Sequence, residues 1–552
     1  MYLYSYDNLS RIAKTEKGRE YVEKVRECYE KEYANKPILA LTYSKFKLFR
    51  KTGDRTQFQL EYFDRRKRFM LLQVLAVFDD KYLEPLEDIM AAICDEFCWT
   101  IPAHCPIWDK EGEHDYTQVD LFNAETGFYL AETAYIFGDK LSIDLRNRIK
   151  LSLKRQIIDN YESRTFGFDT MKNNWATVCS CGIGLTYLYA FPERFKIVKD
   201  RIFTAMERYI NNLDPDGYCS EGFSYWVYGF GFFTLFFDVY CQLTGERPAI
   251  LDSERVKNTI KYAQNAVLEG GVFLPISDGG MTNEHAEENT LSVINRVFNV
   301  SVKIGNGRAV KPDTQVLGLR CLYSTSVVPP ESKVEKGGVF FEKSQVLVVK
   351  KDGYDFISKG GNNAEMHNHN DIGAFSIFRK GVQYIVDPGA GEYTSGYFND
   401  PTIRYSEKTF TCSSLGHSVP IIDGQVQDYG KDYFSTVLDR TDSSITYDLS
   451  TAYPKKLDKF TVTYGYEDNK VTASYSLKGL EKGATFRFIS SIEPKIDSDG
   501  VLIKEMKITC DKKALPEVSV INYSSHGAIP KTAYAIDYSF NGDIDVSFNF
   551  DF

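Results

Sequence analysis

Apolar residues recur at helical spacing over the first part of the chain, from residue 8 to about 300. Two examples are the run Phe69, Leu72, Val74, Leu75 and Phe78 and the run Phe128, Ala131, Ala134 and Tyr135. Residues three or four positions apart share one face of a helix, and Pro and Gly fall mainly between these runs. Roughly ten such segments follow one another without a convincing strand or a short repeat. The pattern predicts an all-helical domain of stacked antiparallel helix pairs.

From about residue 338 the pattern changes to alternation of apolar and polar residues, interrupted by turn residues. Examples are GVFFEKSQVLVVKKDGYDFISKGG, AFSIFRKGVQYIVDPG and KVTASYSLKG. Alternation with period two indicates half-buried strands, so this part predicts an antiparallel sheet sandwich. We therefore expect an α+β multidomain chain with a helical domain over 1–320 and a sheet domain over 338–552. The Gly- and Pro-containing stretch 301–337 is the expected connection.

Composition narrows the class of protein. The 552 residues imply more than one domain, and the formal net charge of −10 gives no general basic surface for nucleic acid or an anionic membrane. A polyanionic partner would need a local basic cleft. The longest apolar run, 226–240, is too short and too often interrupted to span a bilayer. We expect no nucleic-acid or membrane partner.

The chain ends and the cysteines suggest a cytoplasmic protein. The first residues, MYLYSYDNLSRIAKTEKGRE, lack the basic and apolar regions of a secretory signal, although a trimmed secreted or periplasmic form would look the same. The eleven cysteines, several of them in apolar helical segments, are more typical of buried reduced thiols than of a disulfide framework.

Histidine is scarce, and three of the seven histidines lie close together in the sheet part. On an extended chain, His367 and His369 would project from one face. The following residues predict a hairpin that brings Asp387 back beside His369, and His417 would complete a His-Asp-His set of metal ligands. Two imidazoles and a carboxylate suit zinc. An isolated His-x-His is a weak signal, and Asp387 also fits a strand-ending turn equally well.

Two further segments in the helical part carry polar groups. Asn173, Asn174 and Trp175 begin an apolar helix, where an asparagine is also a good N-cap. If the next segment is helical from Glu221, then Glu221, Tyr225 and Tyr228 share one face. Such a stripe is usually core, but three polar tips on one face would need partners if buried and would otherwise line a cleft.

These segments together resemble the heparinase II/III-like polysaccharide lyases. The residues that carry the resemblance are Asn173-Asn174-Trp175, Glu221-Gly222-x-Ser224-Tyr225-Trp226-x-Tyr228-Gly229, His367-x-His369-x-Asp371-x-Gly373-x-Phe375, and Asp387-Pro388-Gly389 with Tyr393. They occur in the expected order from about 100 to 420. The resemblance implies an incomplete α/α toroid followed by antiparallel β-sheets. It also implies β-elimination at a 4-O-linked uronic acid.

The resemblance also assigns roles. Asn174, with Asn173 as the alternative, would bind the uronate carboxylate together with His367. Tyr228, ranked before Tyr225, would protonate the leaving O4. Several relatives carry a histidine base at or beside the asparagine position, and this chain has Asn-Asn-Trp there, so the tyrosine, helped by His367, becomes the expected proton acceptor.

Further positions follow from the same resemblance. The zinc set of relatives maps onto His369, Asp387 and His417 in a structural or supporting role, and Glu221, Trp175 and His104 would contact substrate. His104 is equally well explained as a histidine at a helix end.

Two function classes stay open at this point. The first is a lyase acting on an acidic oligosaccharide or polysaccharide. The second is a non-catalytic, zinc-stabilised carbohydrate-binding protein of the same fold. A hydrolase is weaker, because the sequence places no pair of carboxylates across one site. Which uronate-containing glycan is bound, endo or exo action, and the oligomeric state do not follow from the sequence.

Overall fold

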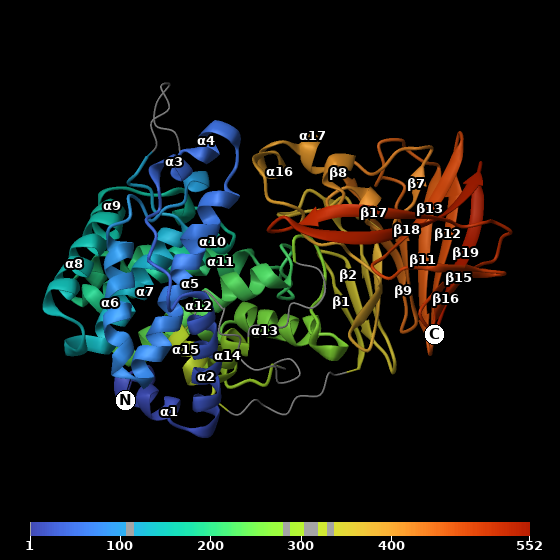
Figure 1. Cartoon of the computed structure of the whole chain (residues 1–552). Helices are drawn as coiled ribbons and strands as arrows, with labels where there is room; N and C mark the ends of the chain where they lie inside the picture. The colour runs from blue at the N-terminus through green and yellow to red at the C-terminus, as the bar shows by residue number, and fades with distance from the viewer. Residues whose placement is uncertain (1, 106–114, 280–287, 303–317, 328–335) are drawn as a thin grey trace. The chain divides into compact units, whose positions relative to one another are not determined.

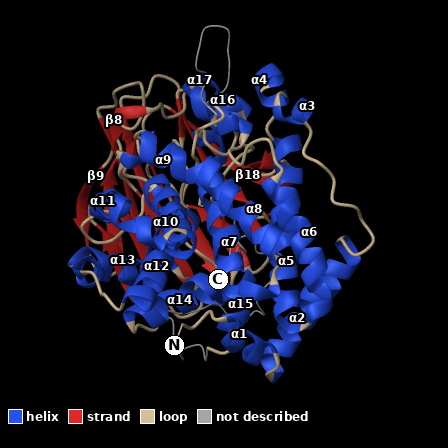
Figure 2. Ribbon diagram, turned by 90° about the vertical axis from the view of Figure 1, so that its left-hand side faces the viewer, coloured by secondary structure: helices blue, strands red, loops and turns tan. Residues whose placement is uncertain are grey.

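The computed structural model describes residues 2–105, 115–279, 288–302, 318–327 and 336–552. Within these residues the chain forms helices first and antiparallel strands afterwards, as Figure 1 and Figure 2 show. The helices before the first strand are α1 (Tyr6–Ala13), α2 (Glu16–Glu32), α3 (Tyr43–Phe46), α4 (Leu48–Thr52), α5 (Thr56–Phe78), α6 (Leu83–Cys94), α7 (Leu121–Phe137), α8 (Ile143–Leu153), α9 (Asp159–Ser163), α10 (Asn174–Ala190), α11 (Phe195–Asn212), α12 (Phe223–Thr244), α13 (Glu254–Ala266), α14 (Glu288–Phe298) and α15 (Gly318–Ser324). The expected order of a helical part and a sheet part is confirmed.

The strands form four antiparallel sheets. The strands are β1 (Gly337–Phe341), β2 (Val346–Lys350), β3 (Asp355–Lys359), β4 (Asn362–Asn363), β5 (Phe375–Arg379), β6 (Val382–Ile385), β7 (Ile421–Ile422), β8 (Gly430–Phe434), β9 (Thr436–Arg440), β10 (Ser444–Asp448), β11 (Lys459–Glu467), β12 (Lys470–Lys478), β13 (Gly483–Ser490), β14 (Lys495–Asp497), β15 (Gly500–Ile503), β16 (Met506–Cys510), β17 (Glu517–Ser525), β18 (Ile529–Asn541) and β19 (Ile544–Asp551). Their orders are β1-β2-β3-β5-β6, β14-β15-β16-β19-β12-β11-β10-β9, β17-β18-β13-β7 and β4-β8. Two short helices, α16 (Ser395–Asn399) and α17 (Pro401–Arg404), interrupt the strands.

The chain divides into two compact units, each made of three separate segments of the sequence. One unit contains Met1–Asn212, Trp226–Ser253 and Glu287–Glu331, and the other contains Leu213–Tyr225, Glu254–Ala286 and Ser332–Phe552. We call them the helical unit and the sheet unit. The division inside 213–286 falls between Tyr225 and Trp226, within α12. The connection expected at 301–337 stays a prediction, because 303–317 and 328–335 lie outside the described residues.

Close helix packing defines the centre of the helical unit. Helix α7 packs against α10, and Gly182 of α10 makes the approach possible, since a Cβ there would lie 2.5 Å from the carbonyl oxygen of Ala124. Polar contacts join α7 to α5 on another side, where the Tyr62 hydroxyl lies 3.0 Å from Thr126 Oγ1. Both helices are buried almost all round, which explains why their sequences carry little amphipathic pattern. No helix in the described part of the chain combines the length and apolar character needed to cross a membrane.

The sheet unit has a core rich in aromatic side chains from three of its sheets. Alternate residues of β11 and β12 point inward, as the period-two pattern predicts. Phe375 of β5 packs edge-on against Phe550 of β19 at 5.3 Å between ring centroids, and Phe550 packs against Phe488 of β13 at 5.2 Å. These contacts join the inner faces of the sheets in one core cluster. The sandwich expected from the sequence is confirmed.

A buried ion pair ties the last helix of the helical unit to its centre. Arg320 of α15 donates two hydrogen bonds of 2.5 Å to Glu132 of α7, and the Tyr189 hydroxyl donates to the same carboxylate at 2.8 Å. Arg320 and Glu132 are both about 2% exposed. Removal of either partner leaves an unpaired charge away from water.

We therefore expect Glu132→Ala to lower the free energy of unfolding by about 3–5 kcal/mol, measured by urea denaturation. The matched control is Asp159→Ala, which breaks the exposed Lys154–Asp159 pair and should cost about 0–1 kcal/mol. Equal effects of the two substitutions would contradict the assignment of the buried pair as a principal tie.

Candidate active site

His367 lies in the loop between β4 and β5 and is held by contacts on both sides of its ring. Its Nδ1 is 2.6 Å from Oδ2 of Asp278, and its ring stacks on that of Tyr225 with 4.1 Å between centroids. Nε2 faces the carboxylate of Glu221 at 3.7 Å, and the side chain is 15% exposed. All these residues belong to the sheet unit. An ionised carboxylate only accepts hydrogen bonds, so Nδ1 carries the proton and neutral His367 has its lone pair on Nε2.

The local backbone differs from the expected extended chain. His367 has φ 56°, which places it in the left-handed region inside a turn, so the argument that His367 and His369 project from one face of a strand is wrong. A non-glycine residue there costs about 1–3 kcal/mol, which the contacts of the side chain have to offset. The two imidazoles nevertheless meet one carboxylate, because His369 Nε2 is 2.9 Å from Asp278 Oδ1.

Asp278 is the residue that joins this cluster, and the sequence analysis missed it. The carboxylate is buried and also accepts hydrogen bonds from the Tyr397 hydroxyl and, at 3.3 Å, from Arg404 Nη2. Burial alone would raise the pKa of Asp278, but hydrogen bonds and charge from His367 and His369 outweigh burial and hold it well below its ordinary value. The only local signal was a Ser-Asp-Gly turn, and Asp278 precedes the histidines by about ninety residues.

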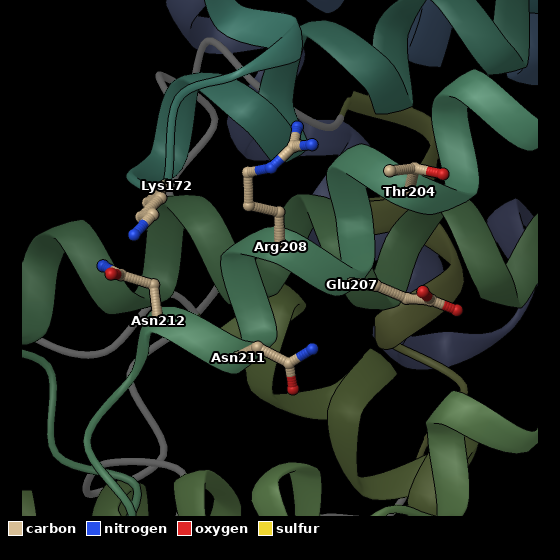
Figure 3. A pocket seen from close by; sticks show the side chains of 6 residues that line it. All are labelled: Lys172, Thr204, Glu207, Arg208, Asn211 and Asn212. Atoms are coloured by element: carbon tan, nitrogen blue, oxygen red, sulfur yellow. The ribbon is translucent and has the colours of Figure 1, made fainter.

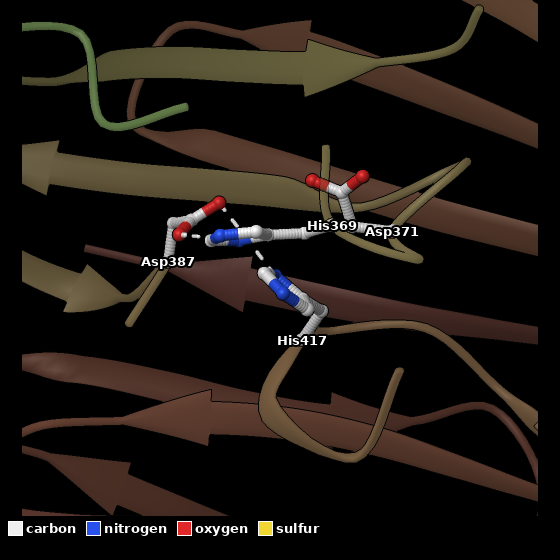
Figure 4. A group of neighbouring side chains, drawn as sticks. All are labelled: His369, Asp371, Asp387 and His417. Carbon is white, nitrogen blue, oxygen red and sulfur yellow. Dashed lines mark ion pairs between the residues drawn. The ribbon is translucent and has the colours of Figure 1, made fainter. Parts of the chain in front are cut away.

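A second buried group of polar side chains lies beside His369 and contains the expected metal ligands. One ligand atom each from His369, Asp371, Asp387 and His417 lies within 4.8 Å of the others, and Figure 4 shows the Asp387 carboxylate facing both rings. The hairpin that returns Asp387 is β5–β6, as predicted. Asp371 is the member that the sequence analysis did not assign to the metal.

Hydrogen bonds engage Nε2 of both histidines in this group, so that Nδ1 of each ring faces the other members. His369 donates from Nε2 to Asp278, and His417 donates from Nε2 to the Thr411 carbonyl oxygen at 2.9 Å. In the neutral form of each ring the lone pair is therefore on Nδ1, which faces Asp387 at 4.0 Å in His369 and 3.6 Å in His417. Among the described residues, His369 Nδ1 and Asp371 Oδ2 are buried and have no hydrogen-bond partner. This donor set fits a metal ion.

The pKa values of the two histidines indicate whether a metal ion has to displace a proton. Burial lowers the pKa of His369, but Cys412 and Asp278 outweigh burial and raise it to about 10. Burial lowers the pKa of His417. A metal ion on Nδ1 of His369 takes the place of a proton, so we expect metal binding to release protons. Asp278, His369 and Cys412 form a second group, but Asp278 is already engaged by three donors from outside this group, His367, Tyr397 and Arg404.

The helical unit holds the other candidate residues at the start of α10. The Asn173 side chain caps this helix by accepting from the Trp175 backbone N–H at 3.3 Å, so the N-cap reading of Asn173 is confirmed. Asn174, the first residue of α10, is buried. His104 ends a short 3-10 helix, Pro102–His104, with Nδ1 2.8 Å from Asp120, and its ring lies 4.8 Å from that of Trp175.

Tyr228 of α12 has different partners from Tyr225. Its hydroxyl donates a hydrogen bond to Glu125 of α7, which also accepts from the Tyr129 hydroxyl at 3.2 Å. Burial raises the pKa of Glu125 to about 7 against the opposing effect of these hydrogen bonds. Burial, followed by the Glu125 charge, raises the pKa of Tyr228 well above its ordinary value. Glu125 was also missed, because it lies within a nearly continuous buried helix that gave no polar stripe.

The expected shared face of Glu221, Tyr225 and Tyr228 is wrong. Helix α12 begins at Phe223, and Glu221 precedes it in a turn. Gly222 has φ 96°, and a Cβ there would lie 2.6 Å from the Ile276 carbonyl oxygen, so this residue fits the turn and not a helix. The Tyr225 hydroxyl lies 2.8 Å from that of Tyr393, whereas Tyr228 reaches Glu125. Burial raises the pKa of Tyr225 as well.

Comparison with known proteins connects this arrangement to a fold. No family model matches the sequence, and no curated protein matches it. Among solved structures, heparinase III matches with a TM-score of 0.65 and 13% identity, covering 96% of this chain and 91% of the other. A mutant of heparan sulfate lyase HepC from Pedobacter heparinus matches with a TM-score of 0.60 and 11% identity, covering 97% and 87%.

A chondroitin AC lyase from Streptomyces coelicolor A3 also matches, with a TM-score of 0.57 and 10% identity, covering 99% of this chain and 82% of the other. The matches extend over nearly the whole chain, although the identities are low. The chain therefore has the fold of the heparinase III-like polysaccharide lyases, a helical toroid followed by antiparallel β-sheets.

Proposed function

We propose that the protein is a lyase that cleaves an acidic oligosaccharide or polysaccharide at a 4-O-linked uronic acid by β-elimination. The observation that carries the proposal is His367, whose Nδ1 is held by Asp278 and whose ring stacks on that of Tyr225, so that Nε2 faces Glu221. This arrangement occurs on the fold of heparinase III and chondroitin AC lyase. A carbohydrate-binding protein without turnover has no need for an imidazole oriented in this way.

The reaction needs donors at the uronate carboxylate, a proton acceptor at C5 and a proton donor at O4. The C5 proton becomes removable when donors neutralise the neighbouring carboxylate and stabilise the developing enolate. Asn174, a buried residue, is proposed to supply such a donor from its side-chain amide, and His367 a second one from Nε2 when its ring is protonated. Trp175, His104, Asn173 and Glu221 are proposed to contact the sugar.

We assign the proton transfers to Tyr228, with Tyr225 as the alternative. Its raised pKa keeps the hydroxyl protonated at neutral pH, which suits the acid that protonates the departing O4. To accept the C5 proton first, Tyr228 has to pass its own proton from Oη to the Glu125 carboxylate, the group to which it already donates. A carboxyl whose pKa lies near 7 accepts this proton more readily than an exposed glutamate whose pKa is about 4.3. The proton returns to Tyr228 when O4 is protonated.

The metal in this proposal is zinc, held by Nδ1 of His369, Nδ1 of His417 and the Asp387 carboxylate, with Asp371 beside them. Two imidazole nitrogens with carboxylate oxygens are typical zinc ligands. When bound, the ion cross-links three segments of the sheet unit and fixes the loop that carries His367, which is a supporting role. Asp278 then orients both the proposed ligand His369 and the proposed catalytic His367.

The lyase reaction can be tested directly. Incubation with a panel of uronate polymers and oligomers should increase the absorbance of the unsaturated uronate, and Tyr228→Phe should lower kcat by about 10²- to 10⁴-fold. Tyr225→Phe separates the two assignments, because the larger loss identifies the acid. Tyr135→Phe, an exposed tyrosine on α7, is the control and should retain full activity. Glycan binding without any product from wild type would instead support the non-catalytic carbohydrate-binding protein.

Asp278→Asn tests the orienting carboxylate. The amide keeps the shape but can donate to Nδ1 of His367 and so favours the wrong tautomer. We expect activity and zinc affinity to fall roughly 10- to 100-fold each, measured by turnover and by elemental analysis after dialysis against a chelator.

The matched control for this prediction is Asp355→Asn, a buried carboxylate of the same unit that accepts from the Glu269 backbone N–H at 2.8 Å and touches no histidine. It should leave zinc content unchanged. Absence of stoichiometric zinc from wild type, with His369→Ala as stable as wild type, would remove the metal from the proposal.

The raised pKa of Glu125 predicts how the stability of the fold depends on pH. The folded pKa of about 7 exceeds the ordinary 4.5, so the protonated carboxyl stabilises the fold by about 3 kcal/mol below pH 4.5. This contribution is lost as the pH rises through 7. Glu125→Gln, which resembles the protonated form, should therefore gain about 3 kcal/mol relative to wild type between pH 4 and 8, measured by urea unfolding. A stability difference that does not change with pH would show that Glu125 has an ordinary pKa.

A further inference from the structure

A surface cavity of about 330 Å³ lies in the helical unit between α11 and the residues before α10. Figure 3 shows its lining, which consists of Lys172, Thr204, Glu207, Arg208, Asn211 and Asn212. The volume is within the range of small-molecule sites. Nearly every lining side chain is polar and carries hydrogen-bond donors, which suits a sugar better than an apolar ligand.

The cavity is locally positive in a chain whose net charge is −10. Arg208 uses Nη1 to donate to the backbone carbonyl oxygen of Asp169, while Arg201 neutralises the Asp169 carboxylate with bonds of 2.8 Å and 2.5 Å. The Arg208 charge is therefore not cancelled by the residue that holds it. Neither Lys172 nor Arg208 forms an ion pair within the described residues.

The polar side chains are divided between the sides of the cavity. Figure 3 shows Lys172 beside Asn212, with Arg208 nearby, whereas the Glu207 carboxylate points toward the opposite side. An anionic group on the Lys172 side would meet the Lys172 amine and the Asn212 amide, with Arg208 as a second positive charge nearby, while lying away from the single carboxylate. Charge-assisted bonds of this kind are among the stronger polar contacts in proteins.

The position in the chain connects the cavity with the candidate active site. Lys172 immediately precedes Asn173, the cap of α10, and is two residues before Asn174. A ligand held at Lys172 therefore lies near the start of the helix to which the uronate-binding asparagine belongs. Helix α11, which supplies the other five lining residues, packs along α10.

We propose that this cavity is a binding subsite for an acidic sugar, with Lys172 and Arg208 holding the anionic group, either a uronate carboxylate or a sulfate, and Asn211 and Asn212 holding sugar hydroxyls. The assignment deepens the proposed function and rests on it for the substrate class. It also supplies the local basic site that a polyanionic partner of an acidic protein needs.

Equilibrium binding of two matched disaccharides tests the subsite. Cellobiouronic acid and cellobiose differ by one carboxylate, and the uronate of the former has no sugar on O4, so it cannot undergo elimination. By calorimetry on the full chain at low ionic strength, we expect wild type to prefer the acid. Lys172→Ala should weaken its binding about tenfold, Lys172→Glu should weaken it further, and cellobiose binding should hardly change. Arg208→Lys, which retains the charge but loses the planar fork, should give an intermediate loss.

The control is Lys196→Ala, which removes one exposed charge from the same helix α11 outside the cavity. It should bind like wild type. Inorganic sulfate is a separate arm: competition with cellobiouronic acid identifies the cationic side as a general anion site, and its absence identifies a carboxylate-specific one. Equal affinity of wild type and Lys172→Glu, or an equal loss in Lys196→Ala, overturns the subsite.

The two proposals fail separately. If wild type cleaves a uronate polymer but Lys172→Glu has unchanged binding and KM, the subsite is wrong and the lyase stands. If no polymer is cleaved but cellobiouronic acid binding depends on Lys172, the subsite stands and the lyase is wrong.

Discussion

The proposed site in the sheet unit depends on one buried carboxylate. Asp278 accepts hydrogen bonds from two histidines, a tyrosine and an arginine, and stays ionised because these donors outweigh the cost of burial. One negative charge thereby decides two tautomers. It leaves the lone pair of His367 on Nε2 and that of His369 on Nδ1, so that the two rings serve different purposes although they are two residues apart. An amide at 278 could donate to these ring nitrogens and would then favour the opposite tautomers.

The two tyrosines of α12 have different hydrogen-bond partners, which separates the roles proposed for them. Tyr225 stacks on His367 and shares a hydrogen bond with Tyr393, and no carboxylate accepts a hydrogen bond from its hydroxyl among the described residues. Tyr228 donates to a buried carboxyl whose pKa is near 7. Of the two, only Tyr228 has a direct partner able to take up and return a proton at neutral pH, which is the physical reason to rank it first. Because the pKa of both hydroxyls is raised, each stays protonated at neutral pH. In the proposed reaction, protonation of O4 is therefore easier for them than removal of the C5 proton.

The sequence predicted the fold class well, because the change from helical to alternating spacing is a property of long segments. It also anticipated that His369, Asp387 and His417 lie together, and the return of Asp387 follows from a hairpin whose register is local. It failed for Asp278 and Glu125, whose importance comes from contacts across about ninety and one hundred residues. It failed for Glu221 as well, because the positive φ of Gly222 ends any helix there and no spacing rule reveals a backbone dihedral angle.

Local charge matters more than net charge for the binding of an acidic glycan. A net charge of −10 would repel an acidic glycan at long range, but screening reduces that repulsion beyond about 8–10 Å at physiological ionic strength. Short-range contacts then decide binding, and these depend on cations that are not paired internally. Several arginines of the helical unit form ion pairs with carboxylates, for example Arg320 with Glu132 and Arg201 with Asp169. The pairing of Arg201 with Asp169 is what leaves Arg208 available, so an internal ion pair contributes indirectly to the positive side of the cavity.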